Sequence, residues 1–143
     1  MYIPSKMYIA VEGLIALAKS QRPCSRVRIC KKAGISTPKY LEDIFNNLRK
    51  SNIISTRRGR GYDFIRPINE ITMADIYESL FGCIDGHSAP GESLFSEILD
   101  QAKADFKNRL SMWSIEDLMQ KEHANLKQKN KGNAGGRSRK SKT

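Results

Sequence analysis

The side chains in this sequence best suited to chemistry are three cysteines, Cys24, Cys30 and Cys83, and two histidines, His87 and His123. The cysteines are odd in number and none is spaced as Cys-x-x-Cys, so their pattern favours neither a disulfide framework nor a zinc site. The histidines have no partner pattern nearby, and no glycine-rich phosphate loop follows a strand. We therefore expect no enzymatic activity and no metal site.

A second kind of chemistry, the binding of a polyanion, is indicated by the run Arg57-Arg58-Gly59-Arg60-Gly61. Guanidinium groups beside residues of minimal bulk can approach a phosphate or enter a narrow minor groove. Charge is divided accordingly: residues 1–66 hold 14 Lys/Arg against 4 Asp/Glu, residues 67–126 hold 4 against 11, and residues 127–143 hold 7 against none. The first half is therefore predicted to bind nucleic acid, and the acidic middle is not.

Apolar spacing predicts the helices that must position these groups. Residues 5–20 have the three-and-four spacing of an amphipathic helix. A short second helix should follow Ser25, which can cap its start, and should end at Gly34. Its expected apolar positions are Val27, Ile29, Cys30 and Ala33.

A third helix is predicted from about Pro38 to Ser51, because proline suits the first helical position and the hydroxyl of Ser36 or Thr37 can cap it. Only three residues separate it from the second helix, which is the pattern of a helix-turn-helix. Its repeating apolar positions are Tyr40, Leu41, Ile44, Phe45 and Leu48.

Behind the third helix the pattern changes to strand, glycine-bearing turn and strand, over residues 53–57 and 62–66. A hairpin directly after a helix-turn-helix is a wing. The fold class predicted is mainly α with a small β-hairpin wing, a winged helix-turn-helix followed by a long C-terminal helix.

Two further helices are predicted at Thr72-x-x-Asp75 and Ser114-x-x-Asp117, which resemble capping boxes. Between them a long helix from about Gly91 carries one apolar stripe. We expect this stripe to pair two copies of the chain; burial against its own domain is the alternative. The stripe consists of Leu94, Phe95, Ile98, Leu99, Ala102, Phe106 and Leu110.

These patterns divide the chain into a DNA-binding domain (1–68), a helical dimerisation region (69–126) and a disordered basic tail (127–143). The tail could add phosphate affinity or merely aid solubility. No apolar run approaches the roughly 18 residues of a membrane span, and the start does not have the pattern of a signal peptide. We expect a cytoplasmic protein.

The residues expected to contact DNA lie on the second and third helices and the wing. The start of the third helix should meet base edges in the major groove, although Tyr40 could instead pack inward. The first turn of the second helix should hold phosphates. The set is Arg26, Arg28, Ser36, Thr37, Lys39, Tyr40, Glu42, Arg57, Arg58, Gly59 and Arg60.

Several of these residues belong to a pattern that resembles a known family, the Rrf-type winged-helix regulators of iron-sulfur assembly, nitric-oxide sensing and cysteine metabolism. The resemblance implies DNA contacts by the third helix and wing, including Tyr40, Glu42, Arg58 and Gly59. It also implies twofold pairing through the long helix at Leu94, Ile98 and Leu99. The pattern comprises Gly34-Ile35-Ser36, Tyr40-Leu41-Glu42-x-Ile44-Phe45-x-x-Leu48-Arg49-Lys50, Arg58-Gly59-x-Gly61-Tyr62 and Arg66-Pro67-x-x-Glu70-Ile71-Thr72-x-Ala74-Asp75-Ile76.

Sensing members of that family bind an iron-sulfur cluster through three closely spaced cysteines before the long helix. Here the region has only Cys83, so we expect no cluster and no other cofactor. Cys83 could be a redox thiol or simply a helix-end residue. The predicted function is a homodimeric repressor that binds a palindromic operator in double-stranded DNA. The alternatives are a thiol-, metal- or redox-sensing regulator and a protein-interaction module that does not bind DNA.

Overall fold

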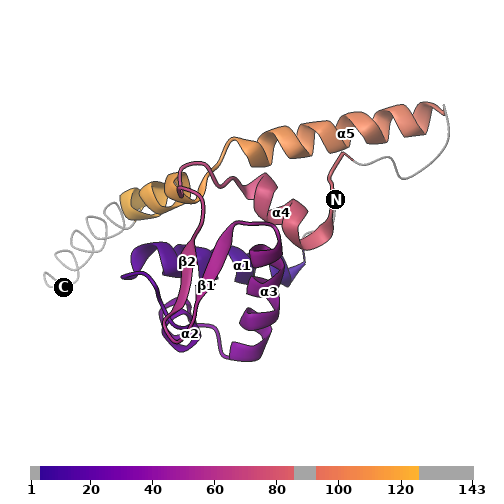
Figure 1. Cartoon of the computed structure of the whole chain (residues 1–143). Coiled ribbons are helices and arrows are strands. Elements are labelled where there is room, and N and C mark those ends of the chain that lie inside the picture. The colour runs from indigo at the N-terminus through magenta and orange to yellow at the C-terminus, as the bar shows by residue number, and fades with distance from the viewer. Residues whose placement is uncertain (1–3, 86–92, 126–143) are drawn as a thin grey trace, which may run out of the picture.

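The computed structural model describes residues 4–85 and 93–125 of the 143-residue chain (Figure 1). Residues 115–125 form one more helix at the end of the described chain. No helix in the described residues is long and apolar enough to cross a membrane. The elements run in the order α1 (Ser5–Lys19), α2 (Arg26–Ala33), α3 (Pro38–Lys50), β1 (Ile54–Arg57), β2 (Gly61–Phe64), α4 (Met73–Phe81) and α5 (Leu94–Ser111).

Helices α1, α2 and α3 pack around one apolar core whose largest fully buried side chains include Phe45, Leu14 and Leu41. Gly13 lies in the middle of α1, facing α3. A Cβ at that position would come within 2.9 Å of Leu41 Cδ1 and 3.0 Å of Phe45 Cε1. Glycine therefore lets the two helices approach closely, and α3 is held firmly by its buried face.

The start and stop signals of α2 act as predicted. Ser25 accepts a hydrogen bond from the backbone N–H of Arg28 at 3.3 Å, and Gly34 ends the helix with a φ of 72°. One predicted apolar position is wrong, because Val27 is 59% exposed while Ile29 and Cys30 are buried. Val27 lies on the outer side of the helix, where its side chain meets solvent.

The start of α3 differs slightly from the prediction. Thr37 occupies the N-cap position, but its side chain makes no capping hydrogen bond. Pro38 occupies the first turn as expected. The hydroxyl of Thr37 is thus not used to stabilise the helix and remains exposed at the surface.

The wing is an antiparallel hairpin in which Ile54 pairs with Phe64 and Arg57 pairs with Gly61. Both strands are shorter than predicted. The segment before α2 adds a third line of pairing, since Cys24 N donates to Tyr62 O at 2.9 Å and Tyr62 N donates to Cys24 O at 2.8 Å. These bonds fix the position of the wing relative to α2.

Both predicted capping boxes are present. The Thr72 hydroxyl and Asp75 carboxylate bond reciprocally to the backbone, as do those of Ser114 and Asp117. The two boxes lie beside each other, because Ile115 N donates to Ile71 O at 3.0 Å. Ile71 and Ile115 are fully buried in the same core as α1 to α3, so this core continues past residues 68 and 69.

Helix α5 lies on the side of the molecule opposite α2 and the hairpin tip (Figure 1). It begins at Leu94, with Ser93 as its N-cap, and the predicted start at Gly91 is outside the described residues. No residue of α5 is buried. Phe106 attaches it to α4 by an edge-on ring contact with Tyr77, 5.2 Å between centroids. The predicted tail, 127–143, also lies outside the described residues.

Candidate nucleic-acid interface

The N-terminal end of α3 presents a polar surface. Ser36, Thr37 and Lys39 are exposed, and Tyr40 is 37% exposed and not part of the buried core. The opposite face of the helix is anchored by four fully buried apolar side chains. The exposed end therefore projects from a rigid base, the arrangement with which a recognition helix enters a major groove.

Arg26 and Glu42 are brought together, although each was predicted to contact DNA by itself. Arg26 Nη1 donates to Glu42 Oε2, which ties the first turn of α2 to α3. Arg26 Nε is buried and has no hydrogen-bond partner among the described residues. Because Arg26 neutralises Glu42, this carboxylate does not present an unpaired negative charge to a DNA backbone. The pair links the two helices at the surface, while their buried faces hold them together.

The wing tip is a tight turn in which Arg60 N donates to Arg57 O at 2.9 Å. Gly59 has a φ of 75°, a left-handed conformation that glycine adopts without strain. Arg57 lies 3.9 Å from Asp63 across the hairpin, so this arginine is partly compensated. Arg58 and Arg60 are exposed and make no ion pair within residues 4–85 and 93–125. They are the tip's free cations.

A groove of about 440 Å³ separates the start of α2 from the wing, and we call it the wing groove. It brings Arg26 and the predicted wing arginines to one surface. Five residues of its lining were not among those predicted to contact DNA, namely Ser25, Val27, Thr56, Gly61 and Tyr62. Val27 had been assigned to the core by its spacing, and its exposure could not be seen without the helix packing. The complete lining is Ser25, Arg26, Val27, Thr56, Arg57, Arg58, Gly59, Arg60, Gly61 and Tyr62.

The floor of this region is uncharged. Burial, followed by the nearby charge of Glu42, raises the pKa of Tyr62, and its ring packs edge-on against Phe45 with centroids 5.0 Å apart. Burial likewise raises the pKa of Cys30. Cys24 and Cys30 are buried in the core. The charged side chains that line the wing groove are arginines.

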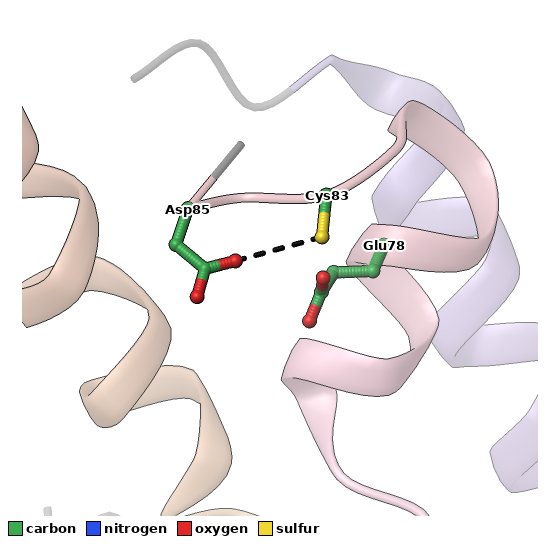
Figure 2. Close-up of side chains that lie close together, drawn as sticks. All are labelled: Glu78, Cys83 and Asp85. Atoms are coloured by element: carbon green, nitrogen blue, oxygen red, sulfur yellow. Dashed lines mark hydrogen bonds between the residues drawn. The ribbon is translucent and has the colours of Figure 1, made fainter. Parts of the chain in front are cut away.

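Cys83 lies in a different place, beside α4 and α5 (Figure 2). Its Sγ donates a hydrogen bond to Asp85 Oδ1 at 3.5 Å. Hydrogen bonds to Glu78 and Asp85 are the largest causes that raise the pKa of this thiol. The pKa of Asp85 is lowered by hydrogen bonds from its own backbone N–H, from the Cys83 thiol and from Lys107. The thiol is therefore held in its protonated, weakly nucleophilic form.

The group Glu78, Cys83 and Asp85 is a possible metal-ligand set, with one ligand atom of each within 4.8 Å of the others. Lys107 already pairs with both carboxylates, 3.5 Å from Glu78 Oε1 and 3.4 Å from Asp85 Oδ2. Iron-sulfur clusters are held mainly by cysteine thiolates, and only one sulfur is present here. Among the described residues this donor set does not fit a cluster.

A family model described as "Iron-dependent Transcriptional regulator" (Rrf2) matches residues 3–121. A Mycobacterium tuberculosis protein named "Putative HTH-type transcriptional regulator" is 43% identical over 90 residues, which make up 60% of this chain and 53% of that relative. The match thus spans about half the length of that relative. The regulator IscR of Cereibacter sphaeroides is 30% identical over 100 residues, 65% of this chain and 64% of the relative.

Solved structures show the same fold. CymR, described as the global cysteine regulator of B. subtilis, superposes with a TM-score of 0.71 at 25% identity, covering 84% of this chain and 97% of CymR. IscR of T. potens has a TM-score of 0.67 at 21% identity, covering 85% of this chain and 88% of IscR. The winged helix-turn-helix prediction is confirmed.

Proposed function

From the premise that this chain belongs to the Rrf2 family of transcriptional regulators, we propose that it is a homodimeric repressor that binds a palindromic operator. The observation that supports this most directly is the convergence of three groups on one surface. The start of α3, the first turn of α2 and the wing tip all lie at the end of the molecule remote from α5 (Figure 1).

In this proposal Lys39 and Tyr40 read base edges in the major groove. Ser36 and Thr37, before the start of α3, donate hydrogen bonds to the phosphate backbone of the DNA. Arg58 and Arg60 reach phosphates or the minor groove beside the half-site. The Arg26–Glu42 pair contributes indirectly by linking the first turn of α2 to α3. Base reading thus depends on a short stretch of side chains positioned by buried neighbours.

Pairing of two copies is proposed to occur through the N-terminal half of α5. Leu94, Phe95 and Ile98 are 72%, 71% and 59% exposed, which is costly for large apolar side chains in water. Leu99 and Ala102 continue this exposed stripe. Phe106 is half-buried against Tyr77 of its own chain, so it supports the stripe from within the protomer. A twofold dimer would place two recognition helices about one DNA turn apart.

We also propose that the regulator carries no iron-sulfur cluster; this is supported by the described residues, in which Cys83 is exposed while Cys24 and Cys30 are buried in the core. Protein purified without oxygen should lack the visible absorption of a cluster. A cluster spectrum with stoichiometric iron and sulfide would contradict this part of the proposal.

The main test is selection of genomic DNA fragments by the purified full-length protein. A palindromic sequence should be enriched, and Lys39→Ala and Arg58→Ala should weaken binding to it. Lys121→Ala, an exposed lysine on residues 115–125, serves as the control and should bind as the wild type does. Equal binding to all fragments by the wild type would refute a sequence-specific regulator.

A further inference from the structure

A second hollow lies where the end of α1 meets α2, and we call it the α1–α2 hollow. Its volume is about 660 Å³. Four of its six lining residues are cations and none is acidic. The lining consists of Lys19, Ser20, Gln21, Arg28, Lys31 and Lys32.

We propose that this hollow binds phosphates of the DNA backbone just outside the operator half-site. One strand would then be held along a continuous track, from the wing tip across α2 to the end of α1. This inference rests on the proposed function, because it extends the same DNA-binding surface. Only Arg28 of this set was indicated by the sequence.

The geometry of α2 makes the track continuous. Arg28, Lys31 and Lys32 stand three and four residues apart, so they share the outer face of the helix. The inner face buries Ile29 and Cys30. Arg26 and Val27 line the wing groove, and the later residues line the hollow, so α2 forms a wall of both. A helix of eight residues is about 12 Å long, which matches roughly three base-pair steps of the duplex.

The charges in the hollow are available to a phosphate. Arg28 and Lys31 are exposed and make no ion pair in the described parts of the chain. The Lys32 ammonium donates to Lys19 O at 3.0 Å, which fixes it at the rim. Several directed cations around one concave surface give a stronger potential than the same charges dispersed over a convex one.

Glu122 opposes this potential at one edge. Its carboxylate lies 3.2 Å from Lys19 Nζ, and both side chains are partly exposed. Exposed pairs of this kind are weak because water screens them, so a phosphate can replace Glu122 as the partner of Lys19. Glu122 is therefore expected to lower DNA affinity.

The first test removes two cations that make no described contact within the chain. In the double variant Arg28→Gln/Lys31→Gln, the slope of log affinity against log salt concentration should become less steep by about 1.8, two phosphates at roughly 0.9 each. Operator affinity at physiological salt should fall on the order of tenfold, with the preferred sequence unchanged. Lys121→Gln is the matched control. An unchanged slope in the double variant overturns the proposal.

The second test concerns the edge of the hollow. Glu122→Gln should tighten operator binding several-fold, because Lys19 no longer has to exchange a carboxylate partner for a phosphate. Glu116→Gln removes a charge from the same helix, where the side chain accepts a hydrogen bond from Gln120 at 3.4 Å and makes no ion pair within the described residues, and should leave the affinity unchanged. Unchanged affinity in Glu122→Gln overturns the role given to Lys19.

Two further outcomes are informative. One distinguishes a free phosphate ion from DNA phosphate, and the other distinguishes failure of the hollow from failure of the proposed function. If calorimetry detects inorganic phosphate in the wild-type hollow while Arg28→Gln/Lys31→Gln leaves the DNA slope unchanged, the site binds a free ion and the DNA assignment is wrong. If the wild type itself has no preferred sequence, the proposed function fails. Failure of the hollow alone leaves a wild type that still selects its palindrome.

Discussion

Gly61 shows how strictly a single residue can be specified by its backbone. Its φ is 107°, and an added Cβ would lie 2.2 Å from Cys24 O, the atom that accepts from Tyr62 N. A side chain here would both strain the backbone and push the wing away from α2. Gly61 is therefore required by packing, independently of any role in DNA contact.

We expect Gly61→Ala to lower the free energy of unfolding by about 3 kcal/mol, measured by urea denaturation. Gly59→Ala is the control, because Gly59 shares the positive φ but an added Cβ would meet nothing within 4 Å. It should cost about 1 kcal/mol, the left-handed conformation alone. Equal losses in the two variants would show that the contact with Cys24 is unimportant.

Cys83 leads to a prediction about pH. Glu78 and Asp85 raise the pKa of its thiol, so at a given pH less of it is thiolate than in an unperturbed cysteine. Alkylation by iodoacetamide should therefore have its midpoint at a pH above the usual one. In Glu78→Gln/Asp85→Asn the midpoint should move to lower pH, since the carboxylates no longer favour the protonated form.

The measurement is a rate-against-pH profile for the full-length protein, with peptide mapping to separate Cys83 from the buried Cys24 and Cys30. Glu116→Gln should leave the midpoint in place. If the double variant and the wild type had the same midpoint, the carboxylates would not control this thiol. A midpoint pH of alkylation below the usual one in the wild type would support the alternative that Cys83 is a redox-sensing thiol.

At the level of single residues, sequence patterns predicted helix caps and stops better than contacts between distant side chains. Ser25, Gly34 and Thr72 were identified correctly because caps and stops depend on neighbours within a few positions. The bond between Arg26 and Glu42 could not be predicted, because they are sixteen positions apart in the sequence and their contact depends on how α2 packs against α3. That bond links the two residues to each other, and their contacts with DNA remain predictions.

Among the elements, the start of α4 is stabilised more strongly than the start of α3. The Thr72 hydroxyl accepts from Asp75 N at 3.2 Å, and Asp75 accepts from Thr72 N at 3.1 Å. Thr72→Ala should therefore destabilise the protein by about 1 kcal/mol in chemical denaturation. Thr37→Ala, whose hydroxyl makes no capping bond, should cost clearly less. The opposite order would mean that these caps do not determine stability.

Element type followed from periodicity because each helix has a local amphipathic pattern. The spacing of Leu41, Ile44, Phe45 and Leu48 was sufficient to predict α3, and all four are fully buried. Spacing failed for Val27, since an eight-residue helix gives too few turns to define its inner face. For α5 the spacing predicted the apolar stripe but not which surface each of its residues contacts. Phe106 contacts Tyr77 of α4 in the same chain.

For the whole molecule, the central prediction is dimerisation through α5. Ile98→Asp should raise the dimer dissociation constant at least about 30-fold, the effect of losing roughly 2 kcal/mol at an interface centre. Sedimentation velocity would measure this, and circular dichroism would confirm folding. Ala104→Asp is the control, because Ala104 is exposed on the opposite side of the same helix. A wild type that sediments as a monomer would contradict the dimer.

The order of elements in the whole molecule was predictable, but the return of the chain to its core was not. Ile71 and Ile115 are separated in the sequence by the whole of α4 and α5. Their backbone hydrogen bond forms only because the chain returns to the core after α5. Nothing local to either residue indicates the other. The boundary expected at residues 68 and 69 remains a prediction about domains, and the apolar core extends across it.

The burial of Ile115 limits how this protein can be dissected. A fragment that stops after the wing would lose Ile71, Ile76 and Ile115, which are fully buried members of the same apolar core as Leu14 and Leu17. The DNA-binding half is thus not a transferable module that can be fused to another partner at residue 68. A hybrid regulator built from it must carry the polypeptide through the last described helix, so α5, the helix predicted to pair two copies, would be transferred together with the DNA-binding surface.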